Sequence, residues 1–211
     1  MKRATQESFA TLTVLAPLRL EARSIRKGAP GVHVVRTGVG PERSRQATRR
    51  LREDPAELLA VAGLCGGVDP NLAVGDVVVA SALSRLGAPP LPVETECMCR
   101  ALEMQGVRAQ LGRILSVDHV VRGLEREALF AEGAVAVDME SAWLAEAANE
   151  RPLGVVRVVL DAPAAEIHPL SILKNGWRAL ASLRRLAPAF EIWASLMCDR
   201  TGKGSSSQVL H

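Results

Sequence analysis

Short apolar runs alternate along the chain with longer segments in which apolar side chains recur every three or four positions. The short runs are rich in Val and Leu and are bounded by Gly, Pro or Asp, which is typical of buried β-strands. The pattern predicts seven strands: Thr11–Ala16, Val32–Arg36, Leu58–Ala62, Asp76–Ala80, Leu111–Leu115, Ala134–Val137 and Leu153–Leu160.

The intervening segments predict helices over Pro41–Glu53, Glu94–Gln105, Leu124–Ala131 and Met139–Asn149. Strands that are buried on both faces and separated by helices indicate an α/β fold. We expect a single domain, residues 1–200, with a mixed, mostly parallel central sheet flanked by helices. The Gly/Ser-rich residues 201–211 are predicted to be a disordered tail.

The last predicted helix runs over Ser171–Met197, with a kink expected at Pro188. Its apolar residues predict a terminal helix that packs on the sheet. The alternative is a surface helix that touches a membrane, because Arg178, Arg184 and Arg185 flank the apolar stripe.

Composition narrows the function classes. The 211 residues are 48% hydrophobic with a formal net charge of +3, so the chain is an ordinary globular protein and not a basic nucleic-acid binder. It has no Tyr and only three Phe and three Trp, which also disfavours a stacking platform for single strands. The four cysteines are too scattered for a disulfide framework, and no His or Cys spacing predicts a metal site.

The N-terminus has one feature of a secretory signal, because Lys2 and Arg3 precede an apolar stretch over Phe9–Leu18. No small-residue cleavage site follows this stretch, so it is interpreted as a buried first strand of a cytoplasmic protein. No apolar run in the sequence reaches the length of a membrane span.

Glycine turns follow two of the predicted strands, where ligands bind in open α/β sheets. Gly38 and Gly40 follow the second strand, and Gly63–Gly67 follows the third. Such turns can present N–H groups to an anion, or they can simply connect a strand to a helix. The dinucleotide fingerprint is incomplete, because Arg43 stands where its third glycine is expected.

Acidic residues are expected at the same edge of the sheet. Asp161 ends the seventh strand and could donate a proton or cap the following turn. Asp138 is predicted to cap a helix beginning at Met139, with Glu140 in its first turn. Arg157 lies in an apolar strand and needs a partner if it is buried.

In this order the segments resemble the purine nucleoside phosphorylase and nucleosidase superfamily. The resemblance rests on Thr37–Gly40, on Gly63–Gly67 followed by Val74–Val78, on Val137–Glu140 and on Arg157–Asp161. It implies the fold described above, a purine nucleoside as the small-molecule partner, no metal or other cofactor, and a homo-oligomer, with a homodimer favoured.

Within that superfamily the chain is most similar to the hopanoid-associated phosphorylases, through Ala16–Arg23 and Gly63–Pro70. This branch is linked to the removal of adenine from an adenosyl-hopane lipid intermediate. The resemblance therefore adds a lipid-linked nucleoside to the candidate substrates and is compatible with peripheral membrane contact.

The resemblance also implies roles for individual residues. Asp161 would protonate or hydrogen-bond N7 of the purine, and Glu140 would hold the ribose hydroxyls. Met139 would pack against the sugar, and Arg157 would fix the carboxylates. Glu21 matches the position that orients water in hydrolytic members, which makes it a candidate general base.

The residues at the family's phosphate site leave open whether water or phosphate accepts the ribosyl group. Where phosphorolytic members place an Arg and a Ser, this chain has Val61 and Leu64, which favours water. The remaining candidates for holding phosphate as a co-substrate are Arg19 or Arg23, together with Gly38 and Gly40. The register that brings Arg19 into the site removes Glu21 from it.

The base and 5′ pockets also depart from the family pattern. Val120 replaces a stacking aromatic residue, and Val121, Gly66 and Cys65 are the other predicted contacts of the base. The short segment Ser84–Pro92 lacks the aromatic residues of soluble-nucleoside enzymes, which predicts an open 5′ side. The alternatives are a methylthioadenosine, S-adenosylhomocysteine or futalosine nucleosidase, and a non-catalytic nucleotide- or lipid-binding module.

Overall fold

Seven strands form one sheet in the computed structural model, which describes residues 10–163 and 169–200. Every predicted strand is present, and β3 and β4 extend past their predicted ends at Ala62 and Ala80. The strands are β1 (Leu12–Ala16), β2 (His33–Arg36), β3 (Leu58–Gly67), β4 (Val77–Arg85), β5 (Ala109–Ser116), β6 (Ala134–Asp138) and β7 (Leu153–Asp161).

The strand pairings close part of this sheet on itself. β3 pairs with β7, β7 with β4, β4 with β5, β5 with β6, and β6 returns to β3. β1 and β2 extend from the first half of β3 as a parallel wing. Only the β3–β6 and β4–β7 pairs are antiparallel, so the prediction of a mixed, mostly parallel sheet is confirmed.

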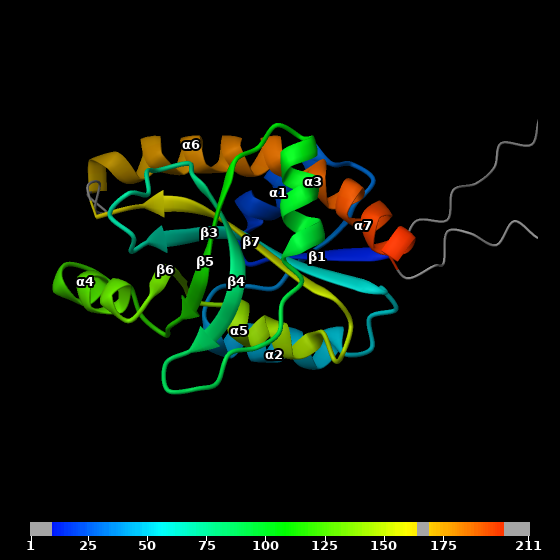
Figure 1. Cartoon of the computed structure of the whole chain (residues 1–211), viewed down its shortest axis with the longest axis horizontal. Coiled ribbons are helices and arrows are strands. Elements are labelled where there is room, and N and C mark those ends of the chain that lie inside the picture. Colours follow the sequence, from blue (N-terminus) through cyan, green and yellow to red (C-terminus); the bar gives the residue numbers. More distant parts are fainter. Residues whose placement is uncertain (1–9, 164–168, 201–211) are drawn as a thin grey trace, which may run out of the picture.

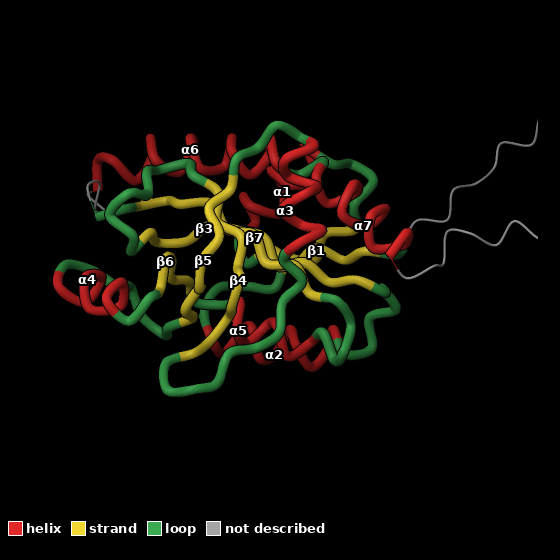
Figure 2. Tube along the Cα trace, in the orientation of Figure 1, coloured by secondary structure: helices red, strands yellow, loops and turns green. Residues whose placement is uncertain are grey.

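Helices cover both faces of the sheet (Figures 1 and 2). α1, α3, α6 and α7 lie on one side, α2 and α5 lie on the other, and α4 projects at one end. Their bounds are α1 (Arg19–Gly28), α2 (Pro41–Leu51), α3 (Glu96–Met104), α4 (Leu124–Ala131), α5 (Ser141–Leu144), α6 (Pro169–Leu186) and α7 (Ala189–Arg200).

α1 and the helix that follows β6 differ from the sequence prediction. α1 was not predicted, because its buried face carries Glu21 beside Ala22 and Ile25 and so lacks a plain apolar stripe. The helix expected over Met139–Asn149 begins only at Ser141 and passes into a 3₁₀ turn over Ala145–Ala147.

Strand alternation builds a separate core on each face of the sheet. Val14 and Ala60 point toward the α1, α3, α6 and α7 side, where they pack with Trp193. Their neighbours Leu15 and Leu59 point to the α2 and α5 side. Because the strands are buried on both faces, their sequences are apolar throughout, which explains why they were predicted correctly.

The C-terminal segment is two helices, because the chain breaks between α6 and α7 at Pro188 where one kinked helix was expected. Leu183 enters the core as predicted. Leu173 and Trp177 do not, since they are 72% and 70% exposed, and the expectation that they pack on the sheet is wrong. They lie on the helix face opposite Ala179 and Leu183.

Residues 201–211, predicted as a tail, lie outside the described residues. Over the parts of the chain that are described, no helix combines the length and the hydropathy that crossing a bilayer requires.

The contact between α1 and α6 generates a stability prediction. A Cβ atom on Gly28 would lie 2.1 Å from the Arg184 carbonyl oxygen and 2.8 Å from the Ala187 Cβ atom. Gly28→Ala should therefore lower the free energy of unfolding by about 1–3 kcal/mol, because backbone must move. Urea unfolding measures this change.

The matched control is Gly176→Ala in α6, where nothing lies within 4 Å of the added Cβ atom. This variant should gain up to about 1 kcal/mol from better helix propensity. Equal effects of the two substitutions would contradict the close packing of α1 on α6.

Candidate active site

One pocket lies at the carboxyl ends of the sheet, where the sequence analysis expected ligands to bind. Its wall includes the ends of β3, β6 and β7 and the segments that follow β1, β2 and β5. The three predicted acids Glu21, Glu140 and Asp161 all line it. Of the other predicted contacts, Cys65, Gly66, Val120, Val121 and Met139 line it as well.

Arg157 lies beneath the pocket and is completely buried. Its Nη2 atom is 2.7 Å from Asp138 Oδ2 and 3.6 Å from Glu140 Oε2. Its Nε and Nη2 atoms both donate to Ser141 Oγ, at 3.0 and 2.8 Å. The strand arginine thus has the carboxylate partners that its burial requires.

Asp138 organises the turn that presents Glu140. Its Oδ1 atom accepts hydrogen bonds from Ser116 Oγ at 2.5 Å and from the amides of Glu140 and Ser141 at 3.2 Å each. This is the capping predicted for Asp138, although the helix begins at Ser141 and Glu140 stands just before it. The turn fixes Glu140 as a wall residue of the pocket.

Glu140 is held from two sides. Its Oε1 atom accepts a hydrogen bond from the Gly40 amide at 3.0 Å, and its Oε2 atom faces Arg157. Burial raises the pKa of Glu140 above its usual value, and Arg157 opposes that shift. The Gly40 amide is therefore occupied by a carboxylate of the same chain.

Glu21 stands at the start of α1 and is buried. Its two carboxylate oxygens accept hydrogen bonds from the amides of Leu18 at 2.6 Å and Leu64 at 2.7 Å. Burial raises its pKa to about 7, with the charge of Arg157 pulling the other way. Such a carboxyl group is suited to general base chemistry near neutral pH.

The close approach of Glu21 and Arg157 depends on a glycine in β3. A Cβ atom on Gly63 would lie 2.6 Å from Arg157 Nη1 and 2.8 Å from Glu21 Oε1. Any side chain at this position would push the cation and the carboxylate apart. Gly63, within the Gly63–Gly67 segment, thus has a steric role in the site.

Asp161 pairs with a residue that the sequence analysis missed. Arg126 of α4 is buried, contacts Asp161 Oδ2 through Nη2, and donates from Nη1 to the Gly67 carbonyl oxygen at 2.7 Å. The other carboxylate oxygen, Oδ1, faces Gly66, 3.4 Å from where a Cβ atom would stand. These contacts of the Asp161 carboxylate favour a place in the pocket over the alternative of a turn cap.

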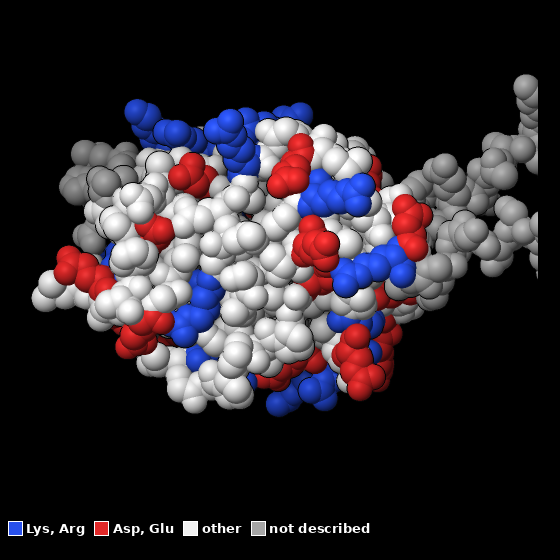
Figure 3. Space-filling model, viewed as in Figure 1, with Lys and Arg blue, Asp and Glu red and all other residues white. Residues whose placement is uncertain are grey.

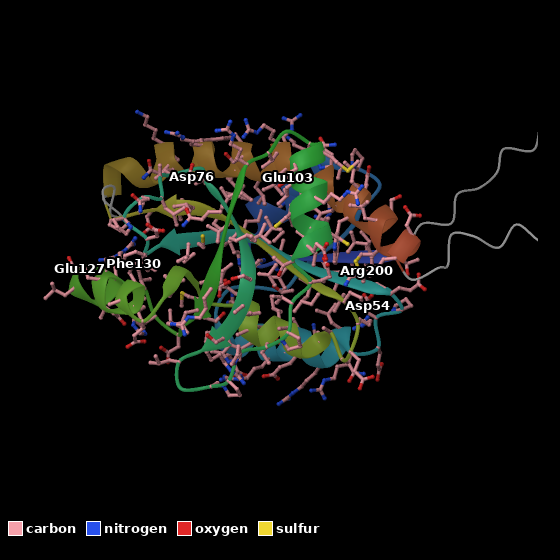
Figure 4. The ribbon with its side chains drawn as sticks, viewed as in Figure 1. Asp54, Asp76, Glu103, Glu127, Phe130 and Arg200 are labelled. Carbon is pink, nitrogen blue, oxygen red and sulfur yellow. The ribbon has the colours of Figure 1, made fainter. Side chains whose placement is uncertain are left out.

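α4 shows why Arg126 was overlooked. Glu127 and Phe130 belong to the part of α4 that projects at one end of the molecule (Figure 4), while Arg126 and Leu129 form its buried face. The only signal in the sequence was a cation three positions before Leu129 on an apolar stripe.

Cys65 is buried, and burial raises the pKa of its thiol to about 12. A thiol that stays protonated is a small core residue and not a reactive nucleophile.

The candidate phosphate residues do not line the pocket. Gly38 and Gly40 have φ values of 93° and 86°, in the region that favours glycine, and form the turn into α2. Arg19 is exposed on α1. Val61, which replaces an arginine of the phosphorolytic pattern, is buried in the core.

The segment expected near the 5′ group also lies outside this pocket. Residues 84–92, all of them described, contribute no wall residue, because they form the end of β4 and the turn after it. Val120 does line the pocket, at its exposed mouth, while Val121 is buried. Neither Phe nor Trp is among the described wall residues.

Comparisons with known proteins identify the family of this chain. Residues 6–189 match the sequence profile of the family described as the phosphorylase superfamily. The chain is 31% identical to a futalosine hydrolase of Streptomyces coelicolor, over 77% of this chain and 81% of that protein.

Solved structures show the same fold. A Helicobacter pylori methylthioadenosine nucleosidase mutant, with 5′-methylthioadenosine in its active site, is similar with a TM-score of 0.70 at 18% identity, over 92% of this chain and 100% of that one. The Neisseria meningitidis 5′-methylthioadenosine/S-adenosylhomocysteine nucleosidase, in complex with methylthio-immucillin-A, gives 0.71 at 23% identity, over 88% and 99%.

The buried charge cluster predicts a large stability effect. Arg157→Leu leaves Asp138 and Glu140 without their buried cation, so the free energy of unfolding should fall by about 3–5 kcal/mol. Urea unfolding followed by circular dichroism measures it.

Arg50→Leu on the exposed face of α2 is the control and should change stability by less than about 0.5 kcal/mol. A loss at Arg157 no larger than that at Arg50 would mean that the cluster does not stabilise the fold.

Proposed function

This chain belongs to the phosphorylase superfamily, and we propose that it cleaves the N-glycosidic bond of a purine nucleoside. The observation that carries the proposal is that Asp161, Glu140 and Glu21, from three distant parts of the sequence, line one pocket. Bond cleavage builds positive charge on the ribose and negative charge on the leaving base. Acids on both sides of the bond can stabilise these two charges.

Asp161 is proposed to act on the base. With Oδ2 held by Arg126, the Oδ1 atom beside Gly66 is the oxygen that can carry a proton to N7 of the purine. Protonation lets the base leave nearly neutral. Arg126 serves as a positioning residue, since its second contact, to the Gly67 carbonyl, ties the carboxylate to the end of β3.

Glu140 is proposed to act on the sugar. Its carboxylate would accept hydrogen bonds from the ribose hydroxyls and stabilise the cationic sugar, while Met139 beside it packs against the ring. Arg157 and the Gly40 amide fix the carboxylate before substrate arrives. A preorganised charge costs no reorganisation during the reaction.

Water is the acceptor that the pocket supports best. Glu21, with a pKa of about 7, can take a proton from water in the pocket. The two arginines at the site, Arg126 and Arg157, are already paired with carboxylates, and Arg19 lies outside the wall. The proposed chemistry is therefore hydrolysis and needs no cofactor, with phosphorolysis as the alternative.

The substituent on the ribose 5′ carbon is proposed to be apolar. Leu18, Val39 and Val120 line the pocket and are 41%, 40% and 52% exposed, so its mouth is an apolar rim. Adenosyl-hopane carries such a substituent. Futalosine and methylthioadenosine are the alternatives, favoured by the proteins that this chain resembles. A homodimer and a cytoplasmic location stay predictions.

A nucleoside panel tests the proposed reaction. Purine release from adenosine, methylthioadenosine, futalosine and a 5′-alkyl adenosine should be independent of added phosphate and fastest for the 5′-alkyl compound. Asp161→Asn should lower the rate by about 10²–10⁴-fold, while Asp199→Asn, an exposed acid of α7, should not change it. Release that requires phosphate would replace hydrolysis with phosphorolysis, and no release from any compound would favour a binding module.

The pH dependence tests the role of Glu21. A general base must be ionised, so kcat/KM should fall as the pH drops below about 7, the value to which burial raises the pKa of Glu21. Glu21→Gln should remove this acidic limb and leave a low, flat profile. A limb that persists in Glu21→Gln with full activity would assign the base to another group.

A further inference from the structure

The outer face of α6 is both apolar and basic. Leu173 and Trp177 stand one turn apart and are largely exposed, so neither belongs to the core. Helical spacing places four cations on the same outward face. These cations are Lys174, Arg178, Arg184 and Arg185, and each is exposed.

α1 extends this face toward the pocket. β1 and β7 both run parallel to β3, and each is followed by a helix that returns along the sheet, so α1 and α6 run side by side in the same direction. Gly28 against the Arg184 carbonyl fixes their crossing. α1 adds further exposed side chains to the surface, namely Arg19, Leu20, Arg23, Arg26 and Lys27.

The cations of this α1–α6 face are not neutralised by the helices that carry them. α6 contains no Asp or Glu, and the single acid of α1, Glu21, is buried. No ion pair among the described residues involves any of these eight cations of α1 and α6. Figure 3 shows the basic side chains gathered in a band over α6.

A carboxylate lies at the rim of the face. Arg178 packs on Gly75, in the turn before β4, and the next residue is Asp76 (Figure 4). The Asp76 carboxylate accepts a hydrogen bond from the amide of Ala73 at 2.8 Å, within its own turn. The field over α1 and α6 therefore stays positive.

We propose that the α1–α6 face binds the surface of an anionic lipid bilayer. Cations without local acids are attracted to acidic headgroups, and an exposed Trp with neighbouring Leu side chains is suited to the interface just below them. A nucleic acid would use the cations but leave Leu173 and Trp177 in water. A second copy packed two-fold on this face would set like charges against each other.

Docking in this way would bring the pocket to the bilayer. α1 and α6 both begin at the edge of the sheet where the pocket opens, and Leu18, directly before α1, lines it. A nucleoside with an apolar 5′ group anchored in the bilayer could then enter from the lipid side. This consequence rests on the proposed function, whereas binding to the bilayer does not.

Vesicle binding tests the proposal directly. The full chain should co-sediment with vesicles of phosphatidylcholine and phosphatidylglycerol and not with phosphatidylcholine alone, and added salt should weaken the binding. Trp143 and Trp193 are buried, so a blue shift of tryptophan emission on binding reports Trp177. Trp177→Phe should bind but show no shift.

Charge variants locate the surface. Arg184→Gln with Arg185→Gln should weaken partition onto anionic vesicles about five-fold for each cation removed. Arg49→Gln with Arg50→Gln, on α2 at the opposite side of the sheet, removes the same charge and should have no such effect. Both double variants should release purine from a soluble nucleoside at the unmodified rate, so a failure of binding is separable from a failure of the proposed reaction.

Several results would overturn the proposal: no binding to anionic vesicles, equal binding to phosphatidylcholine alone, or equal losses in the α2 and α6 variants. Binding of an RNA oligonucleotide without vesicle binding would assign the face to a nucleic acid instead. A change of sedimentation coefficient in the Arg184 and Arg185 variant, again without vesicle binding, would assign it to a second copy.

Discussion

Arg157 lies wholly inside the protein, and a guanidinium in that position must be surrounded by carboxylates or the fold cannot tolerate it. Asp138 and Glu140 therefore come to it from the end of β6, and Glu21 comes from α1. The cation holds three acids close together that would otherwise repel one another. Three acids of the pocket wall are thus held in place by this buried cation, while Asp161 is held by Arg126.

β3 is the strand that makes the arrangement geometrically possible. Its first half pairs with β1, its last residues pair with β6, and β7 runs along its whole length. The pocket lies where β3 stops pairing with β1 and begins to pair with β6. The glycines of β3 serve this same region, since side chains at Gly63 or Gly66 would meet Glu21, Arg157 or Asp161. The glycines at these positions of β3 are thus explained by the close packing of charged groups around the strand.

Much of the fold and of the site could be predicted from the sequence, for a physical reason. Strands buried on both faces are apolar along their length, so all seven could be predicted, and the acids at their ends could be expected at one edge. Features set by tertiary contact were missed. α1 hides Glu21 on its buried face, Arg126 is recognisable only through its partner Asp161, and Trp177 follows the spacing of a core residue although it faces outward.

The site divides into two charge clusters, and the division bears on how a substrate must lie. Arg126 and Asp161 are joined across the ends of β3 and β7, while Arg157, Glu140 and Glu21 gather below β6 and α1. Under the proposed function, a purine against the first cluster would have its glycosidic bond between the two. The sugar would then meet Glu140, and the 5′ carbon would point toward the exposed side chains of Leu18, Val39 and Val120. Polar groups are thus concentrated where charge develops, and the mouth is left to apolar contacts, which is the arrangement expected when the remainder of a substrate is a hydrocarbon.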